Sequence, residues 1–150
     1  MKRFQKILFA IISLIVFACI LFLASCPIIN NYSAQKVKDD ICAIPLPKAT
    51  IKLEEVSRAG KLVGNGNGMQ FFGAILLESA LSLEELDKYY SQYRDHDWSY
   101  LVEKQDTQNI QVIEHGTLSF SSDVSDKNCY IVYSWGEGIS PFADFDLRGN

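Results

Sequence analysis

Residues 7–24 read ILFAIISLIVFACILFLA, and this stretch decides how the whole chain is organised. Ser13 carries its only side chain that is not apolar, and no charged residue occurs between Lys6 and Lys36. A helix that crosses a bilayer needs about 20 predominantly apolar residues. Extending the run to residues 7–29 supplies this length, so we expect a transmembrane helix or a lipoprotein signal there.

The residues before the apolar run predict its orientation. Lys2, Arg3 and Lys6 precede the run, and positive charges are retained on the cytoplasmic side of a membrane helix. We therefore expect residues 1–6 to form a cytoplasmic basic segment and the remainder to be translocated. The expected location is the cell membrane, crossed once, with the C-terminal domain outside.

Three fates of the apolar segment stay open at this point. An uncleaved signal anchor fits its length, because the apolar core of a secretory signal usually has about 7–15 residues. A lipoprotein signal fits Leu-Ala-Ser-Cys at residues 23–26, where Cys26 would be lipidated and become the new N-terminus. Ordinary cleavage would release a secreted protein. Pro27 is an unusual neighbour for a processing site and disfavours both cleaved forms.

The chain beyond the run has an ordinary soluble composition. Positions 1–24 hold 19 of the 72 hydrophobic residues, which leaves 53 among the other 126, or 42%. Removing three of the 14 basic residues leaves 11 against 18 acidic ones, a net charge of −7. This acidity argues against a nucleic-acid partner, because phosphates must be met by clustered Lys and Arg. Residues 30–40, NNYSAQKVKDD, predict a polar tether, and residues 41–150 an extracytoplasmic domain.

The external part predicts an α+β fold in the order β-β-α-β-β-β, an antiparallel sheet of about five strands with one helix packed on one face. We expect strands at residues 50–63, 69–78, 98–104, 110–120 and 128–135, and a helix at residues 83–95. Glycines in GNGNG at 64–68 suit a hairpin turn. Apolar residues on both faces of 69–78 predict a central strand. Ser82 and Glu85 predict a capping box at the helix start.

Aromatic residues lie at two further places. Trp98 follows the predicted helix, and we expect its ring to fill the end of the helix–sheet core. Phe142, Phe145 and Leu147 alternate with polar residues in the tail at 136–150. We expect this tail to be an irregular segment packed along the sheet.

Candidate chemistry is sparse. The sequence contains no Walker loop, HExxH, GxSxG or CxxC pair, so we expect no cofactor and no metal site. Glu114 and His115 are the weak catalytic candidates, since a neighbouring carboxylate and imidazole can do acid–base work. Adjacent residues on a strand point to opposite faces, so this pair requires a bulge at Gly116.

Four cysteines are present, and two of them, Cys19 and Cys26, belong to the apolar run. Cys42 and Cys129 lie outside it. They can form a disulfide that joins the Pro-rich segment at residues 41–47 to the last strand, because the compartment outside the membrane can be oxidising. The alternative, which is equally plausible from the sequence, is that both cysteines are unpaired and act as small apolar residues.

Two stretches carry a resemblance to known proteins: IPLPKAT at residues 44–50 and SLEELDKYYSQYRDHDW at residues 82–98. They resemble uncharacterised small membrane-anchored or lipoprotein-like exported proteins of Gram-positive bacteria. The shared order is a Pro-containing start, a strand pair, a helix that carries Leu and Tyr, and then Trp98. The resemblance covers about residues 41–148. It implies export and a compact α+β fold, and it implies no activity and no catalytic residues.

Three functions follow as hypotheses. The first is a non-catalytic interaction or accessory module at the cell surface, anchored in the lipid bilayer through residues 7–29. Its protein partner would contact the sheet face that the helix leaves uncovered, or the aromatic tail. The second is a small hydrolase or ligand-binding protein with its site around Glu114 and His115. The third is an accessory to a membrane complex, with the anchor helix as the interface.

Overall fold

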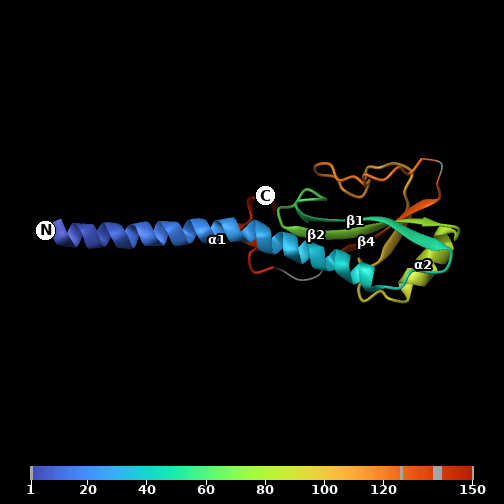
Figure 1. Cartoon of the computed structure of the whole chain (residues 1–150), viewed down its shortest axis with the longest axis horizontal. Helices are drawn as coiled ribbons and strands as arrows, with labels where there is room; N and C mark the ends of the chain where they lie inside the picture. The colour runs from blue at the N-terminus through green and yellow to red at the C-terminus, as the bar shows by residue number, and fades with distance from the viewer. Residues whose placement is uncertain (1, 126, 137–139, 150) are drawn as a thin grey trace.

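The computed structural model describes residues 2–125, 127–136 and 140–149. Within them the fold is α+β, with a long N-terminal helix that leads into an antiparallel sheet (Figure 1). The elements in chain order are α1 Lys2–Ala43, β1 Thr50–Gly60, β2 Gln70–Ser79, α2 Leu83–Ser91, β3 Leu101–Lys104, β4 Cys129–Trp135, and the 3-10 helices η1 Ala143–Phe145 and η2 Leu147–Gly149.

The N-terminal half of α1 stands clear of the domain, and its C-terminal part lies along the sheet (Figure 1). An 18-residue window of this helix has a mean hydropathy of 3.2, and none of that window is buried. The helix is therefore long and apolar enough to cross a membrane, as the sequence predicts. Pro27 lies inside the helix, which continues beyond it to Ala43.

The expected tether at residues 30–40 is instead part of α1. Asn30, Ala34 and Ile41 recur at helical spacing and are fully buried or nearly so. Gly73 of β2 allows the close approach, because a Cβ there would lie 2.7 Å from the Cα of Lys38. The polar composition of this segment reflects its solvent-facing side, and its other side is part of the domain core.

The sheet has the order β1-β2-β4-β3, and every neighbouring pair is antiparallel. β2 lies between β1 and β4, which confirms the prediction of a central strand. The β1–β2 pairing runs from Thr50 opposite Ser79 to Gly60 opposite Gln70, with a register shift between Lys52 and Glu54.

Each face of the sheet has its own core. On one face, α1 and α2 bury the side chains of Ile41, Ile75, Leu77, Leu86, Tyr90 and Val132. On the other face, the segment between β3 and β4 covers the sheet with Ile110, Phe120 and Val124. The sheet face that was expected to be open to a partner is therefore buried, and this prediction is wrong.

The fifth strand, expected at residues 110–120, does not form. The described residues there contain one isolated bridge, Asn109 to Ser119, and Gly116 has a φ of +77°. The alternating apolar side chains of this segment cover the sheet instead of extending it. β3 begins only at Leu101, and Trp98 is 64% exposed and does not fill the core.

α2 begins as predicted. The Ser82 hydroxyl accepts a hydrogen bond from the Glu85 amide at 3.2 Å, and the Glu85 carboxylate accepts one from the Ser82 amide at 2.8 Å. This capping box satisfies two of the free amide groups at the helix start. The helix ends at Ser91, four residues earlier than expected.

Candidate functional site

Glu114 and His115 hold the loop between β1 and β2. The Gly64 amide donates to the Glu114 carboxylate at 2.7 Å, and His115 Nε2 lies 2.6 Å from the Gly64 carbonyl oxygen. Both backbone amides donate to the Leu62 carbonyl, at 2.8 and 2.9 Å. Both residues are exposed, and neither lines the two cavities described below. The geometry gives this pair a structural role in positioning the loop.

The cysteines are free thiols. Cys42 packs on the helix-covered face of the sheet, and Cys129 is buried on the opposite face. The sheet separates the two, so the disulfide alternative is wrong for this structure. Cys26 is fully buried in α1, where its Sγ donates to the Phe22 carbonyl oxygen at 3.3 Å.

Cys42 belongs to a small charged cluster that joins α1 to β1. Lys38 and Lys52 contact the Glu55 carboxylate at 2.9 and 2.5 Å, and the Cys42 thiol donates to it at 3.2 Å. The two lysines lower the pKa of Glu55 to about 2. Burial, and then Glu55, raise the pKa of the Cys42 thiol. The thiol is therefore protonated at neutral pH, which makes it a poor nucleophile.

No catalytic or metal-binding set is found in the part of the chain that the structure describes. No group of three or more His, Cys, Asp or Glu side chains there could hold a metal ion. The geometry supports contact surfaces better than chemistry, and these gather at one end of the sheet.

An apolar cleft of about 440 Å³ lies at the end of the sheet that faces the apolar half of α1. Phe71, at the start of β2, packs near Ala34, whereas Leu77, at the other end, packs near Ile41. The start of β2 therefore points toward the apolar half of the helix. The side chains that form the cleft include Val63, Met69, Phe71, Trp98, Val112 and Trp135. This surface is defined here as the Trp98 cleft.

Trp98 is held at the cleft by its backbone. Its carbonyl oxygen accepts a hydrogen bond from the Trp135 amide at 3.0 Å, while its ring stays largely exposed. A large exposed ring on a fixed backbone is typical of a contact surface. The sequence indicated an aromatic residue here but not its exposure, because that depends on how the segment between α2 and β3 turns.

A second, more polar cavity of about 420 Å³ lies on the α1 side of the same end. It shares Phe71, Trp135 and Gly136 with the Trp98 cleft, and Lys36, Asp40, Asp95, His96 and Tyr100 also line it. A Cβ at Gly136 would lie 2.7 Å from a methyl carbon of Val37, so glycine allows α1 to approach. Charges of both signs line this cavity, which therefore favours no simple ion.

A polar cluster with two buried members, Asn30 and Asp146, fixes the C-terminal tail to α1. We call Asn30, Asp146 and Arg148 the tail lock. Asn30 Nδ2 donates to Asp146 Oδ2 at 2.9 Å, and the Arg148 guanidinium donates to both Asp146 oxygens, at 2.7 Å for Nη2 and 3.0 Å for Nε. Arg148 also donates to Asn31 Oδ1 at 2.8 Å and to the Pro27 carbonyl oxygen at 3.1 Å. The lock therefore attaches the tail to about one turn of α1, from Pro27 to Asn31.

The environment of Asp146 stabilises its charge. Its side chain is 1% exposed, and Arg148 is the largest cause that lowers its pKa to about 2. Asn30 is fully buried, and its Oδ1 has no hydrogen-bond partner among the described residues. The sequence alone does not predict this cluster, because Asn30 and Asp146 lie 116 residues apart. The available signal was the spacing of Asn30, Ala34 and Ile41, which fits one helical face.

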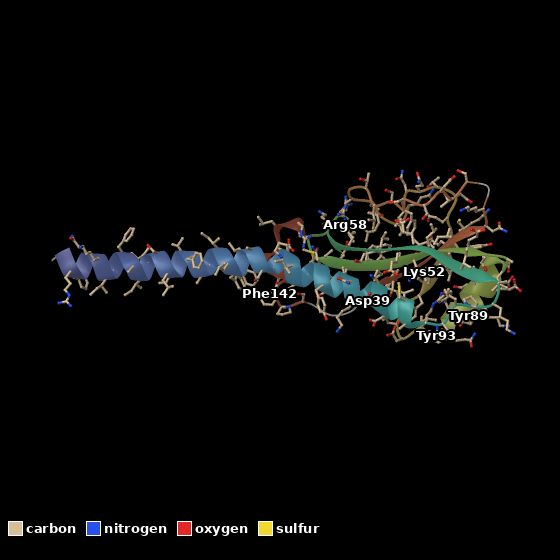
Figure 2. The ribbon with its side chains drawn as sticks, viewed as in Figure 1. Asp39, Lys52, Arg58, Tyr89, Tyr93 and Phe142 are labelled. Atoms are coloured by element: carbon tan, nitrogen blue, oxygen red, sulfur yellow. The ribbon has the colours of Figure 1, made fainter. Side chains whose placement is uncertain are left out.

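Aromatic residues of the tail pack on α1 at Phe22, on the N-terminal side of the tail lock, and not along the sheet as expected. The ring centroids of Phe142 and Phe145 lie 5.6 and 5.2 Å from that of Phe22. Figure 2 shows Phe142 where α1 enters the domain, far from Tyr89 and Tyr93 at the other end. The tail therefore marks the boundary between the exposed part of α1 and the folded domain.

The tail also bonds to the β1–β2 loop. The Lys61 amide donates to the Arg148 carbonyl oxygen at 2.8 Å, and the Gly68 amide donates to that of Gly149 at 2.7 Å. One segment thus connects the helix to the hairpin.

Comparison of this chain with protein-family models, curated proteins and solved structures gives no match.

Proposed function

We propose that this protein is a single-pass membrane protein whose extracytoplasmic α+β domain is a non-catalytic interaction module held over the bilayer in one orientation. One observation carries the proposal: α1 is a single helix with an exposed apolar half and a C-terminal part built into the sheet. Exposed apolar surface on this scale has a large cost in water, and a bilayer removes that cost.

The contacts around Phe22 support an uncleaved anchor over a lipoprotein. Cleavage before Cys26 would remove Phe22, and with it the ring on which Phe142 and Phe145 pack. It would also place a lipidated Cys26 at a fully buried position. The uncleaved chain keeps the ring contacts of Phe22 and leaves Cys26 buried and unmodified.

The distribution of charge supports the orientation. Lys2, Arg3 and Lys6 precede the apolar run, and the remainder has a net charge of −7 from 11 basic and 18 acidic residues. The positive-inside tendency favours a cytoplasmic N-terminus. The domain would then lie outside, with the Trp98 cleft at its membrane-facing end.

The Trp98 cleft is the proposed contact surface. Its occupant would be a protein segment with an apolar anchor side chain and basic flanking residues, because the cleft is apolar and the external part as a whole has a net charge of −7 from 11 basic and 18 acidic residues. Interface energy concentrates at large aromatic residues in such positions. Trp98 is therefore the residue expected to contribute most.

Photo-crosslinking in intact membranes tests the proposal. A photoreactive amino acid placed at Val63, which lines the cleft and leaves Trp98 in place, is expected to give a discrete adduct with a protein partner. The matched control is the same substitution at Leu83, which is exposed and lies on α2 at the other end of the domain. Equal labelling from both positions, or none from Val63, would contradict the cleft as the contact surface.

Extraction with alkaline carbonate tests the anchor separately. The full chain is expected to remain in the membrane pellet, as integral proteins do. Release of the intact chain into the supernatant would contradict a spanning helix.

A further inference from the structure

The C-terminal tail carries apolar side chains that the described residues of the domain leave largely exposed. Leu147 is 85% exposed and Phe145 is 52% exposed, although both follow a segment that packs closely on α1. Domains leave single apolar residues exposed without consequence. Here Phe145 packs on Phe22 of the helix that would cross the bilayer, and Leu147 lies between Asp146 and Arg148, which both bond to that helix.

Helix geometry gives the depth of these residues. Phe22 lies 16 residues beyond Lys6, the last charge before the apolar run, which is about 24 Å along a helix. The hydrocarbon core of a bilayer is about 30 Å thick, so a core that begins at Lys6 ends near residue 26. The rings of Phe142 and Phe145, which pack on Phe22, therefore lie at the depth of the outer acyl chains.

The polar part of the tail lies farther from the centre of the bilayer than the two rings. Arg148 contacts Pro27 and Asn31, which follow residue 26 and fall at the depth of the headgroups. Its guanidinium also pairs with Asp146, so this pair brings no uncompensated charge toward the lipid, and the proposal requires the exposed Asp144 carboxylate to lie among the headgroups. Apolar groups inside the boundary and polar groups outside it is the arrangement of an interfacial segment.

We propose that the tail at residues 140–149 is a second membrane contact, in which Phe145 and Leu147 enter the outer leaflet beside α1. This inference rests on the proposed function, because it requires α1 to span the bilayer. The contact is apolar and does not depend on anionic lipid, since the external part is acidic. It would fix the tilt of the domain and the distance of the Trp98 cleft from the membrane surface.

Fluorescence quenching in lipid nanodiscs tests this contact with the full chain. The discs contain phosphatidylcholine brominated near the headgroup end of its acyl chains, or the same lipid without bromine. The reporter is Leu147→Trp, whose position tolerates a larger side chain because it is so exposed. Phe145→Trp is the second reporter, and the signal of the parent chain, which contains Trp98 and Trp135, is subtracted.

Two matched variants make the result interpretable. Ile15→Trp reports on the middle of the apolar run, and Leu83→Trp reports on α2, which lies at the far end of the domain (Figure 1). We expect bromine to reduce the emission of Leu147→Trp more than twofold, to reduce that of Ile15→Trp, and to leave that of Leu83→Trp unchanged.

The outcomes separate the two proposals. Quenching of Ile15→Trp without quenching at either tail position would overturn the tail contact and leave the spanning helix intact. Absence of quenching at Ile15 as well would overturn both. The emission of the tail tryptophans could instead be unaffected by bromine but change with the protein-to-lipid ratio. This result would place the tail against a second copy of the chain and would also overturn the inference.

Discussion

The substitution Asp146→Asn tests how the tail is held to α1. It keeps the shape of the side chain but removes its charge, and it turns one acceptor oxygen into a donor. The buried carboxylate accepts from Asn30 Nδ2 and from two nitrogens of the Arg148 guanidinium, at 2.7 to 3.0 Å. In the variant a new NH₂ group faces one of these donors, so at least one charge-assisted hydrogen bond is lost.

Two estimates give the magnitude. A hydrogen bond to a charged group contributes about 1.5–3 kcal/mol, and the Arg148 side chain, which is 38% exposed, recovers some hydration when it is released. The pKa of Asp146 falls from 3.8 to about 2, which corresponds to about 2 kcal/mol as an upper value. We therefore expect the free energy of unfolding to fall by about 2 kcal/mol and the Tm by about 8 °C.

The pH dependence identifies the charge as the cause. Because the folded-state pKa of Asp146 is lowered, its contribution is fully present above about pH 4 and is lost as the pH falls toward 2. The Tm difference between the parent and Asp146→Asn should shrink over the same range. Asp144→Asn, an exposed position in the same tail, is the matched control and should change little.

The assay is thermal unfolding of the full chain in nanodiscs, followed by tryptophan fluorescence. A Tm for Asp146→Asn within about 1 °C of the parent at pH 7 would refute the argument for a stabilising lock. A difference of the expected size that does not change down to pH 2 would show that shape, and not charge, is responsible.

Three further perturbations follow from the same structure. Gly73→Ala should destabilise the domain by about 1–3 kcal/mol in thermal unfolding, because its Cβ collides with the α1 backbone, whereas Gly66→Ala, which has open space, should have a much smaller effect. Ser82→Ala should lower the free energy of unfolding by about 1 kcal/mol in denaturant titration, and an unchanged midpoint would contradict the role of the cap. Glu55→Gln should speed alkylation of Cys42 by iodoacetamide severalfold at pH 8, since Glu55 raises the pKa of that thiol, and a slower reaction would contradict this.

Local signals in the sequence were sufficient for several elements. The apolar run at residues 7–24 was recognised from composition, and the central strand β2 from apolar residues on both of its faces. The capping box at Ser82 was recognised because its two hydrogen bonds join residues three apart. Each of these features depends on neighbours in the chain.

Features that depend on distant contacts were missed. The segment at residues 30–40 looks polar and follows Pro27, so a tether was expected, yet its narrow buried face completes a helix against the sheet. Ile110 and Phe120 lie on an alternating pattern that predicts a strand, but they cover the sheet. Asp146 meets Asn30 across 116 positions, and no local pattern indicates such a pairing.

One continuous helix, α1, connects the apolar run to the domain, and a distance measured across Pro27 shows whether it is unbroken. Spin labels at Ile15 and Asp39 are separated by 24 residues, which is about 36 Å in an unbroken helix. Both positions are exposed, and the native cysteines are replaced by alanine. Pulsed electron–electron double resonance in nanodiscs should give a narrow distribution of label-to-label distances centred near this value. A broad distribution with a shorter mean would contradict the account, because it would show a flexible tether between the anchor and the domain.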